Sequence, residues 1–81
     1  MITVLLFASV AEKAGTRRLE LPDGTGTTVG DIRDQLVERY PALEPMLPNL
    51  LFAVDEEYVR TDAPVRAGQT VAVIPPVSGG C

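Results

Sequence analysis

The sequence predicts an α+β domain in which a mixed sheet of about five strands carries one main helix packed on one face. Short runs of apolar and β-branched residues begin and end the chain, and one stretch between them repeats apolar residues at helical spacing. Residues typical of turns separate these runs. The 81 residues suffice for one domain, and an apolar fraction of 46% favours a packed core over disorder.

The first two strands are predicted at residues 2–9 and 17–21, with a turn at Ala14-Gly15 between them. Apolar residues occur on both faces of the first run, which indicates a central strand. Pro22-Asp23-Gly24 has strong turn chemistry and ends the second strand. The inward face of the first strand would hold Ile2, Val4, Leu6 and Ala8.

Thr28 is predicted to open the helix, because its hydroxyl can accept a hydrogen bond from a free backbone N–H of the first turn. Asp31 adds a negative charge near the positive end of the helix. Pro41 ends the helix after Tyr40. The apolar positions that follow helical spacing are Val29, Ile32, Leu36, Val37 and Tyr40.

Three further strands are predicted at residues 49–54, 58–60 and 70–74. Pro45 and Pro48 make the stretch before them a loop or a short 3₁₀ turn. The crossover rule allows the last strand to lie parallel beside the first. The resulting order is the β-grasp, or ubiquitin-like, arrangement, with residues 1–76 as the domain and 77–81 as an extended, flexible tail.

Charge and composition exclude several classes of function. The net charge is −4 and no basic run occurs, which argues against nucleic acid and against an anionic membrane surface. With no histidine and a single cysteine, Cys81, the chain cannot form an internal disulfide, a Cys/His zinc cluster or a His-dependent catalytic triad. No basic residue precedes the apolar start and no run approaches the ~20 apolar residues of a membrane span, so a cytoplasmic protein is expected.

The C-terminal tail is the first candidate site. Pro75 and Pro76 would hold it extended, and Gly79 and Gly80 would remove side chains where a backbone threads a narrow channel. From Val77 to Gly80 such a tail reaches about 10 Å. It could therefore place its end inside another protein, whereas a frayed terminus without function is the alternative.

Two further candidates lie on the folded part. Phe7 and Ile74 would be neighbours on the outer face of adjacent strands and would form an apolar patch for a partner, unless the register is displaced by one residue. The acidic group Asp55-Glu56-Glu57 could bind a hard cation, but it lies in a two-strand connection without a partner group, so a solvated turn is the preferred interpretation.

The whole chain resembles the small-subunit family of molybdopterin synthase (the MoaD family). The ending Pro-Pro-Val-Ser-Gly-Gly is the most specific part of the resemblance, and thiamine-pathway carriers resemble it less. The other matching residues are Ile2-Thr3-Val4-Leu5-Leu6-Phe7-Ala8, Glu12, Gly15-Thr16, Thr28-Val29, Ile32-Arg33, Ala53-Val54, Gly68 and Val71-Ala72-Val73.

The resemblance implies a sulfur carrier. An ATP-dependent E1-like enzyme would adenylate the carboxylate of Gly80, a sulfur donor would convert it to a thiocarboxylate, and the tail would deliver sulfur to cyclic pyranopterin monophosphate inside the large synthase subunit. This chain would be the non-catalytic subunit, with no cofactor of its own and with the catalytic groups on the large subunit. Gly80 would carry the sulfur and Gly79 would give a slim approach, while the partner-binding residues would be Phe7, Tyr58, Ile74, Pro75, Pro76, Val77 and Ser78.

Cys81 departs from the family, because it ties the Gly80 carbonyl into a peptide bond. A protease could remove it, it could be an addition to the natural sequence, or its thiol could itself carry sulfur. Two functional alternatives also stay open: a sulfur carrier of another pathway, of thiamine or cysteine type, and a β-grasp interaction module without sulfur chemistry.

Overall fold

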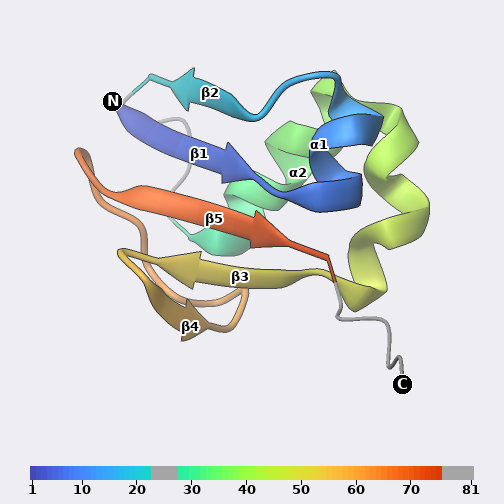
Figure 1. The fold of residues 1–81 in the computed structure, drawn as a ribbon. Coiled ribbons are helices and arrows are strands. Elements are labelled where there is room, and N and C mark those ends of the chain that lie inside the picture. Colours follow the sequence, from blue (N-terminus) through green and yellow to red (C-terminus); the bar gives the residue numbers. More distant parts are fainter. Residues whose placement is uncertain (23–27, 76–81) are drawn as a thin grey trace.

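The computed structural model describes residues 1–22 and 28–75, and within them one five-stranded sheet has the order β2-β1-β5-β3-β4 (Figure 1). The first and last strands pair in parallel, and the other pairs are antiparallel. The predicted mixed sheet and its ubiquitin-like arrangement are therefore confirmed. The strands are β1 (Ile2–Leu6), β2 (Arg18–Leu21), β3 (Leu51–Val54), β4 (Glu57–Val59) and β5 (Thr70–Ile74).

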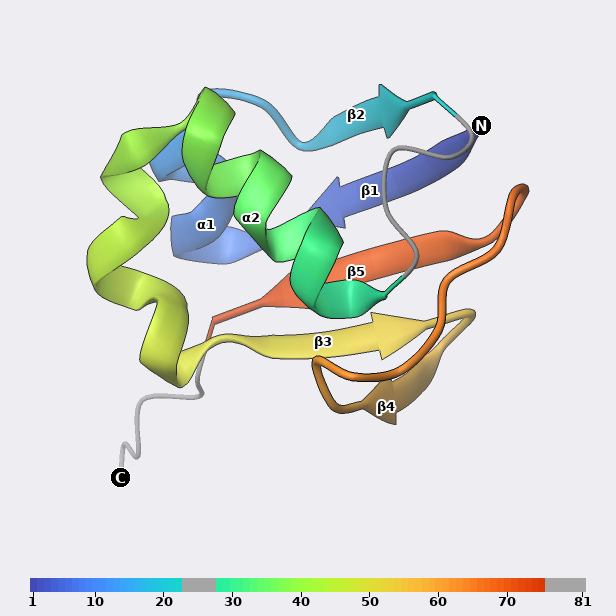
Figure 2. The ribbon, with the colours of Figure 1, turned by 180° about the vertical axis from the view of Figure 1, so that it is seen from behind.

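Helix α2 (Val29–Arg39) crosses one face of the sheet, as Figure 2 shows from behind. Its start is a capping box, in which the Asp31 N–H donates to the Thr28 hydroxyl and the Thr28 N–H donates to the Asp31 carboxylate, both at 3.2 Å. Tyr40 is the C-cap residue and Pro41 follows it. The predicted helix is confirmed, together with its start and its end.

The first predicted strand is too long, because the chain turns into helix α1 (Ala8–Ala14) directly after β1. Phe7 is still extended, but Ala8 has a φ of 49°, which breaks the strand. The segment Ala-Ser-Val-Ala-Glu-Lys-Ala is rich in helix-forming residues and buries Val10. Ala8 is consequently exposed rather than on the inward face, and Gly15 is the left-handed C-cap of this helix rather than part of a simple turn.

The proline-rich stretch forms a 3₁₀ helix, η1 (Pro41–Asn49), which buries Leu43. It takes up Asn49, so β3 begins two residues later than predicted, at Leu51. Strand β4 begins one residue earlier than predicted, at Glu57, and leaves only Asp55 and Glu56 in the turn.

Asp55 and Glu56 both have positive φ values, of 48° and 71°, as in the type I′ turns that connect tight hairpins. The Asp55 carboxylate accepts hydrogen bonds from the backbone N–H of Thr70 at 3.1 Å and from Nε2 of Gln69 at 3.0 Å. Asp55 thus ties the hairpin to the start of β5, and Glu56 and Glu57 are exposed. Among the described residues no group of three or more His, Cys, Asp or Glu side chains could hold a metal ion.

No helix within residues 1–22 and 28–75 has the length and apolar character needed to cross a membrane.

The core lies between the sheet and the helices. The largest fully buried side chains are Ile2, Val4, Val10, Leu21, Val29, Ile32, Leu36, Leu43, Val71 and Val73.

Candidate functional site

One face of the sheet is open, since the helices of the described part lie over the other face or at the end of β1 (Figures 1 and 2). The strands place alternate residues on this outer face. Val71 and Val73 of β5 are fully buried on the inner side, so Thr70, Ala72 and Ile74 belong to the outer face, which confirms the prediction for Ile74.

The strand register sets the outer-face residues side by side in rows across the sheet. In the middle row Leu5 of β1 is opposite Ala72, and Ala72 is opposite Ala53. Ala53 is in turn opposite Tyr58 of the edge strand β4. Apart from Arg18, which pairs with Leu5 on β2, this row is apolar or aromatic.

The rows on either side differ in polarity. Toward the C-terminal end of β5, Ile74 is opposite Leu51. The Phe7 N–H donates to the Val73 carbonyl at 3.2 Å, which holds Phe7 beside this end of β5. Toward the other end, Thr3 is opposite Thr70 and Glu20. The outer face therefore grades from polar to apolar in the direction in which β5 runs.

Three large apolar side chains of this face are well exposed: Phe7 at 45%, Leu51 at 43% and Tyr58 at 71%. A group of this kind on a small domain indicates a surface for a partner protein. We call it the apolar patch, and it comprises Leu5, Phe7, Leu51, Tyr58, Ala72 and Ile74.

The structure places Phe7 and Ile74 on the outer face, as the strand pattern predicted, and Tyr58 lies on the same face. Phe7 reaches this face from the junction of β1 and α1 rather than from within a strand. Leu51 was missed, because the run Leu50 to Val54 is apolar at every position and its alternation does not reveal which side faces outward. Its pairing with Ile74 would have identified it.

Pro75, at the end of β5, is half-buried, and the predicted tail residues Pro76, Val77, Ser78, Gly79 and Gly80 lie outside the described residues. Since β5 runs parallel to β1, its C-terminal end lies beside Phe7, at the apolar end of the outer face. The described part of the chain therefore ends, at Pro75, beside the apolar patch.

Fold and site together define a ubiquitin-like β-grasp domain with an open, apolar sheet face at the base of its C-terminal segment. The chain belongs to the ThiS family, whose profile matches residues 4–80.

Curated relatives and solved structures agree with this membership. The molybdopterin synthase sulfur carrier subunit of Arabidopsis thaliana is 39% identical over 79 residues, which cover 98% of this chain and 82% of that protein. The subunit of the same name from Mycobacterium tuberculosis is 35% identical over 80 residues, covering 98% and 96%. The crystal structure of SAMP1 from Haloferax volcanii superposes with a TM-score of 0.85 at 33% identity and covers 98% of both chains.

Proposed function

We propose that this chain is the sulfur carrier subunit of a molybdopterin synthase and works in the cytoplasm. The observation that carries the proposal is the likeness to proteins of that name, at 39% and 35% identity over nearly the whole chain. The position of the apolar patch supports it, because a protein that bound the segment after Pro75 could also contact the apolar residues beside it.

In this proposal the reactive group is the carboxyl group of Gly80. A carboxylate is a poor electrophile, so an E1-like enzyme joins it to AMP from ATP and releases pyrophosphate. A donor of sulfide-level sulfur then displaces AMP and leaves a thiocarboxylate. Its sulfur bonds to cyclic pyranopterin monophosphate in the large subunit, and water cleaves the bond between this sulfur and the Gly80 carbonyl, which returns Gly80 to a carboxylate. Gly79 keeps the approach to that site narrow, and Pro75, Pro76, Val77 and Ser78 lie along the entrance.

The chain supplies binding and delivery, and its partners supply the catalytic groups. Phe7, Tyr58 and Ile74, together with Leu51, would dock on the large subunit and on the activating enzyme in turn. Cys81 has to be removed first, by a protease in the natural setting, because its peptide bond occupies the carbonyl of Gly80.

The test is a mass measurement on two versions of the chain, one ending at Gly80 and one ending at Cys81. Each is incubated with the activating enzyme, ATP and a sulfur donor. We expect only the version ending at Gly80 to gain the mass difference between sulfur and oxygen. If that version never gains it, the sulfur-carrier proposal is wrong.

The pathway is tested separately, by complementation of strains that lack individual carriers. Restored molybdoenzyme activity supports the synthase subunit, whereas restored growth without thiamine or cysteine assigns the chain to another sulfur pathway. Retained function after removal of Gly79, Gly80 and Cys81 would identify a pure interaction module.

A role as a protein modifier is the second candidate, favoured by the likeness to the small archaeal modifier protein SAMP1. Chemically it needs only that an amine of another protein, instead of sulfur, displaces AMP from the activated Gly80 and forms an amide. Covalent adducts that appear on a denaturing gel after activation, and that depend on Gly80, would favour this candidate.

A further inference from the structure

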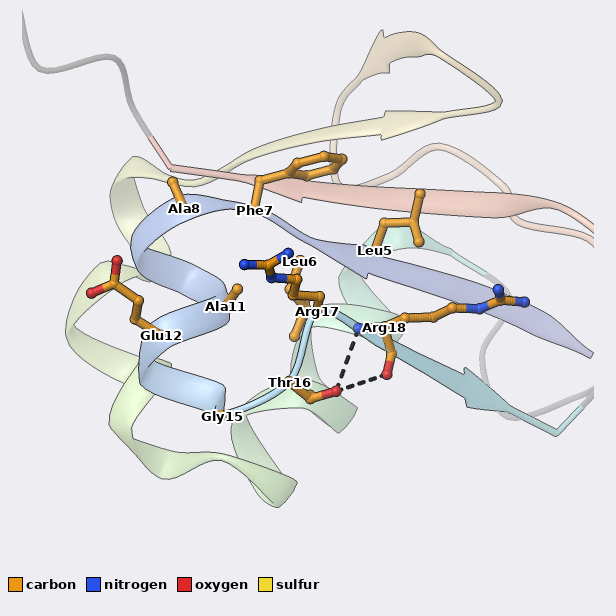
Figure 3. A pocket seen from close by; sticks show the side chains of 10 residues that line it. All are labelled: Leu5, Leu6, Phe7, Ala8, Ala11, Glu12, Gly15, Thr16, Arg17 and Arg18. Atoms are coloured by element: carbon orange, nitrogen blue, oxygen red, sulfur yellow. Dashed lines mark hydrogen bonds between the residues drawn. The ribbon is translucent and has the colours of Figure 1, made fainter.

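Next to the apolar patch, helix α1, the end of β1 and the approach to β2 enclose an open hollow of about 630 Å³ (Figure 3). Its floor consists of apolar atoms from Leu5, Phe7, Ala8 and Ala11. A volume of this size is within the range of sites that accept small ligands or several side chains. The rim on the side of β2 is formed by Gly15 and the three residues after it.

Arg17 brings to this hollow a positive charge that no other residue of the described part pairs with. Its carbonyl accepts a hydrogen bond from the Leu6 N–H at 2.8 Å, which holds its backbone against β1. Figure 3 shows its side chain turned over the hollow, near Leu6 and Ala11. Its guanidinium is exposed and has no hydrogen bond or ion pair with any residue of the described part.

The other charged residues at the hollow are directed elsewhere. Arg18 extends along β2 and pairs with Glu20 at 3.2 Å. Glu12 leaves helix α1 on the side away from Arg17. The Thr16 hydroxyl donates to the Arg18 carbonyl at 2.9 Å, so it is engaged with the backbone of the rim. A group bound in the hollow would therefore meet an apolar floor and one positive charge.

We propose that this hollow binds an acidic peptide segment of a partner protein, with an apolar side chain on the floor and a carboxylate paired with Arg17. The local charge argues for this occupant, because the Arg17 guanidinium is exposed and free of ion pairs within the described residues and would attract a carboxylate. The net charge of −4 opposes an acidic segment elsewhere on the molecule, which would confine its binding to the hollow. The apolar floor favours a peptide over an inorganic anion, which would leave the floor in contact with water.

The hollow is also continuous with the apolar patch. Leu5 and Phe7 belong to both surfaces, so a protein seated on the patch needs only a short segment to reach Arg17. The proposal goes beyond sulfur carriage, because it assigns to the hollow between α1 and β2 a second contact with a partner protein. It depends on no step of the sulfur chemistry.

The test uses the full chain, labelled with ¹⁵N, and two blocked tetrapeptides as probes, acetyl-Glu-Leu-Phe-Glu-amide and acetyl-Lys-Leu-Phe-Lys-amide. We expect the acidic peptide to shift the amide resonances of Phe7, Gly15, Thr16 and Arg17, and the basic peptide to leave them in place. The Arg17→Glu variant should bind the acidic peptide about fivefold more weakly or worse, since an exposed attraction is replaced by repulsion.

The matched control is Arg66→Glu, which makes the same change of charge at an exposed site in the turn before β5. That turn lies near Met1, because the Gly68 N–H donates to the Met1 carbonyl, and so at the opposite end of β1 from the hollow. The proposal is overturned if both peptides shift the same resonances, if neither does, or if both variants bind equally. The assay contains no activating enzyme and no sulfur, so its failure is distinguishable from failure of the proposed function.

Discussion

Glu56 is a non-glycine residue held at a φ of 71° in the two-residue turn between β3 and β4. An L-residue in the left-handed region costs about 1–2 kcal/mol, because its Cβ crowds the following carbonyl. Glycine removes this cost but loses about 0.5–1 kcal/mol of additional conformational entropy on folding. The relief of strain is the larger of the two effects, so we expect Glu56→Gly to stabilise the domain by about 0.5–1 kcal/mol.

The assay is equilibrium unfolding in urea together with a thermal scan, in which a gain of 1 kcal/mol raises the Tm of a domain of this size by about 4–8 °C. Glu57→Gly is the matched control, because Glu57 is also exposed but lies in strand β4 and has no positive φ. We expect the control to lose about 0.5–1 kcal/mol, as glycine does inside a strand. If both variants are destabilised equally, backbone strain does not dominate at Glu56 and the argument is refuted.

Three further predictions use burial and capping. Leu43 of η1 is fully buried, so Leu43→Ala should lower the free energy of unfolding by about 3 kcal/mol in a denaturant titration. Leu51→Ala is the control, because this side chain is 43% exposed, and it should lower the free energy of unfolding by less than about 1 kcal/mol. Equal losses in the two variants would contradict the assigned core. Thr28→Ala removes the hydroxyl that accepts from Asp31 and should cost about 1 kcal/mol, and an unchanged stability would show that the cap is unimportant. Tyr58→Ala should change stability by less than about 0.5 kcal/mol. If the proposed function is right, it should weaken binding to the large synthase subunit by about tenfold in calorimetric titration, and unchanged binding would exclude Tyr58 from the proposed contact.

The sheet could be predicted because apolar and other residues alternate within single strands. Val71 and Val73 alternate with Thr70, Ala72 and Ile74, and this alternation defines the inner and outer face of β5 without reference to the rest of the chain. The helix that begins after Thr28 has a cap, an apolar stripe and a proline at its end, all of which are visible in the sequence.

Helix α1 was not predictable in the same way. The apolar run that begins at Val4 continues without a break into Phe7 and Ala8. The residue that interrupts the strand is an alanine with a positive φ, for which no sequence rule applies. The segment is rich in helix-forming residues, but its packing through Val10 on the core is a tertiary contact that the sequence pattern does not display.

Only part of the apolar patch could be predicted from the sequence. Phe7 and Ile74 follow from counting along two strands that were expected to be adjacent, whereas Leu51 requires the pairing of β3 with β5. Helix α1 forms one wall of the hollow beside Arg17, so the hollow could not be predicted from a sequence pattern that did not reveal this helix.

The last strand of the chain, β5, occupies the centre of the sheet, between β1 and β3. A growing chain that has not yet produced residues 70–74 has no partner to join β1 to β3, and both strands keep open edges that invite aggregation. Closing the sheet must wait for contacts between the two ends of the chain, which are slow to form. The domain can therefore complete its sheet only after residues 70–74 have been synthesised.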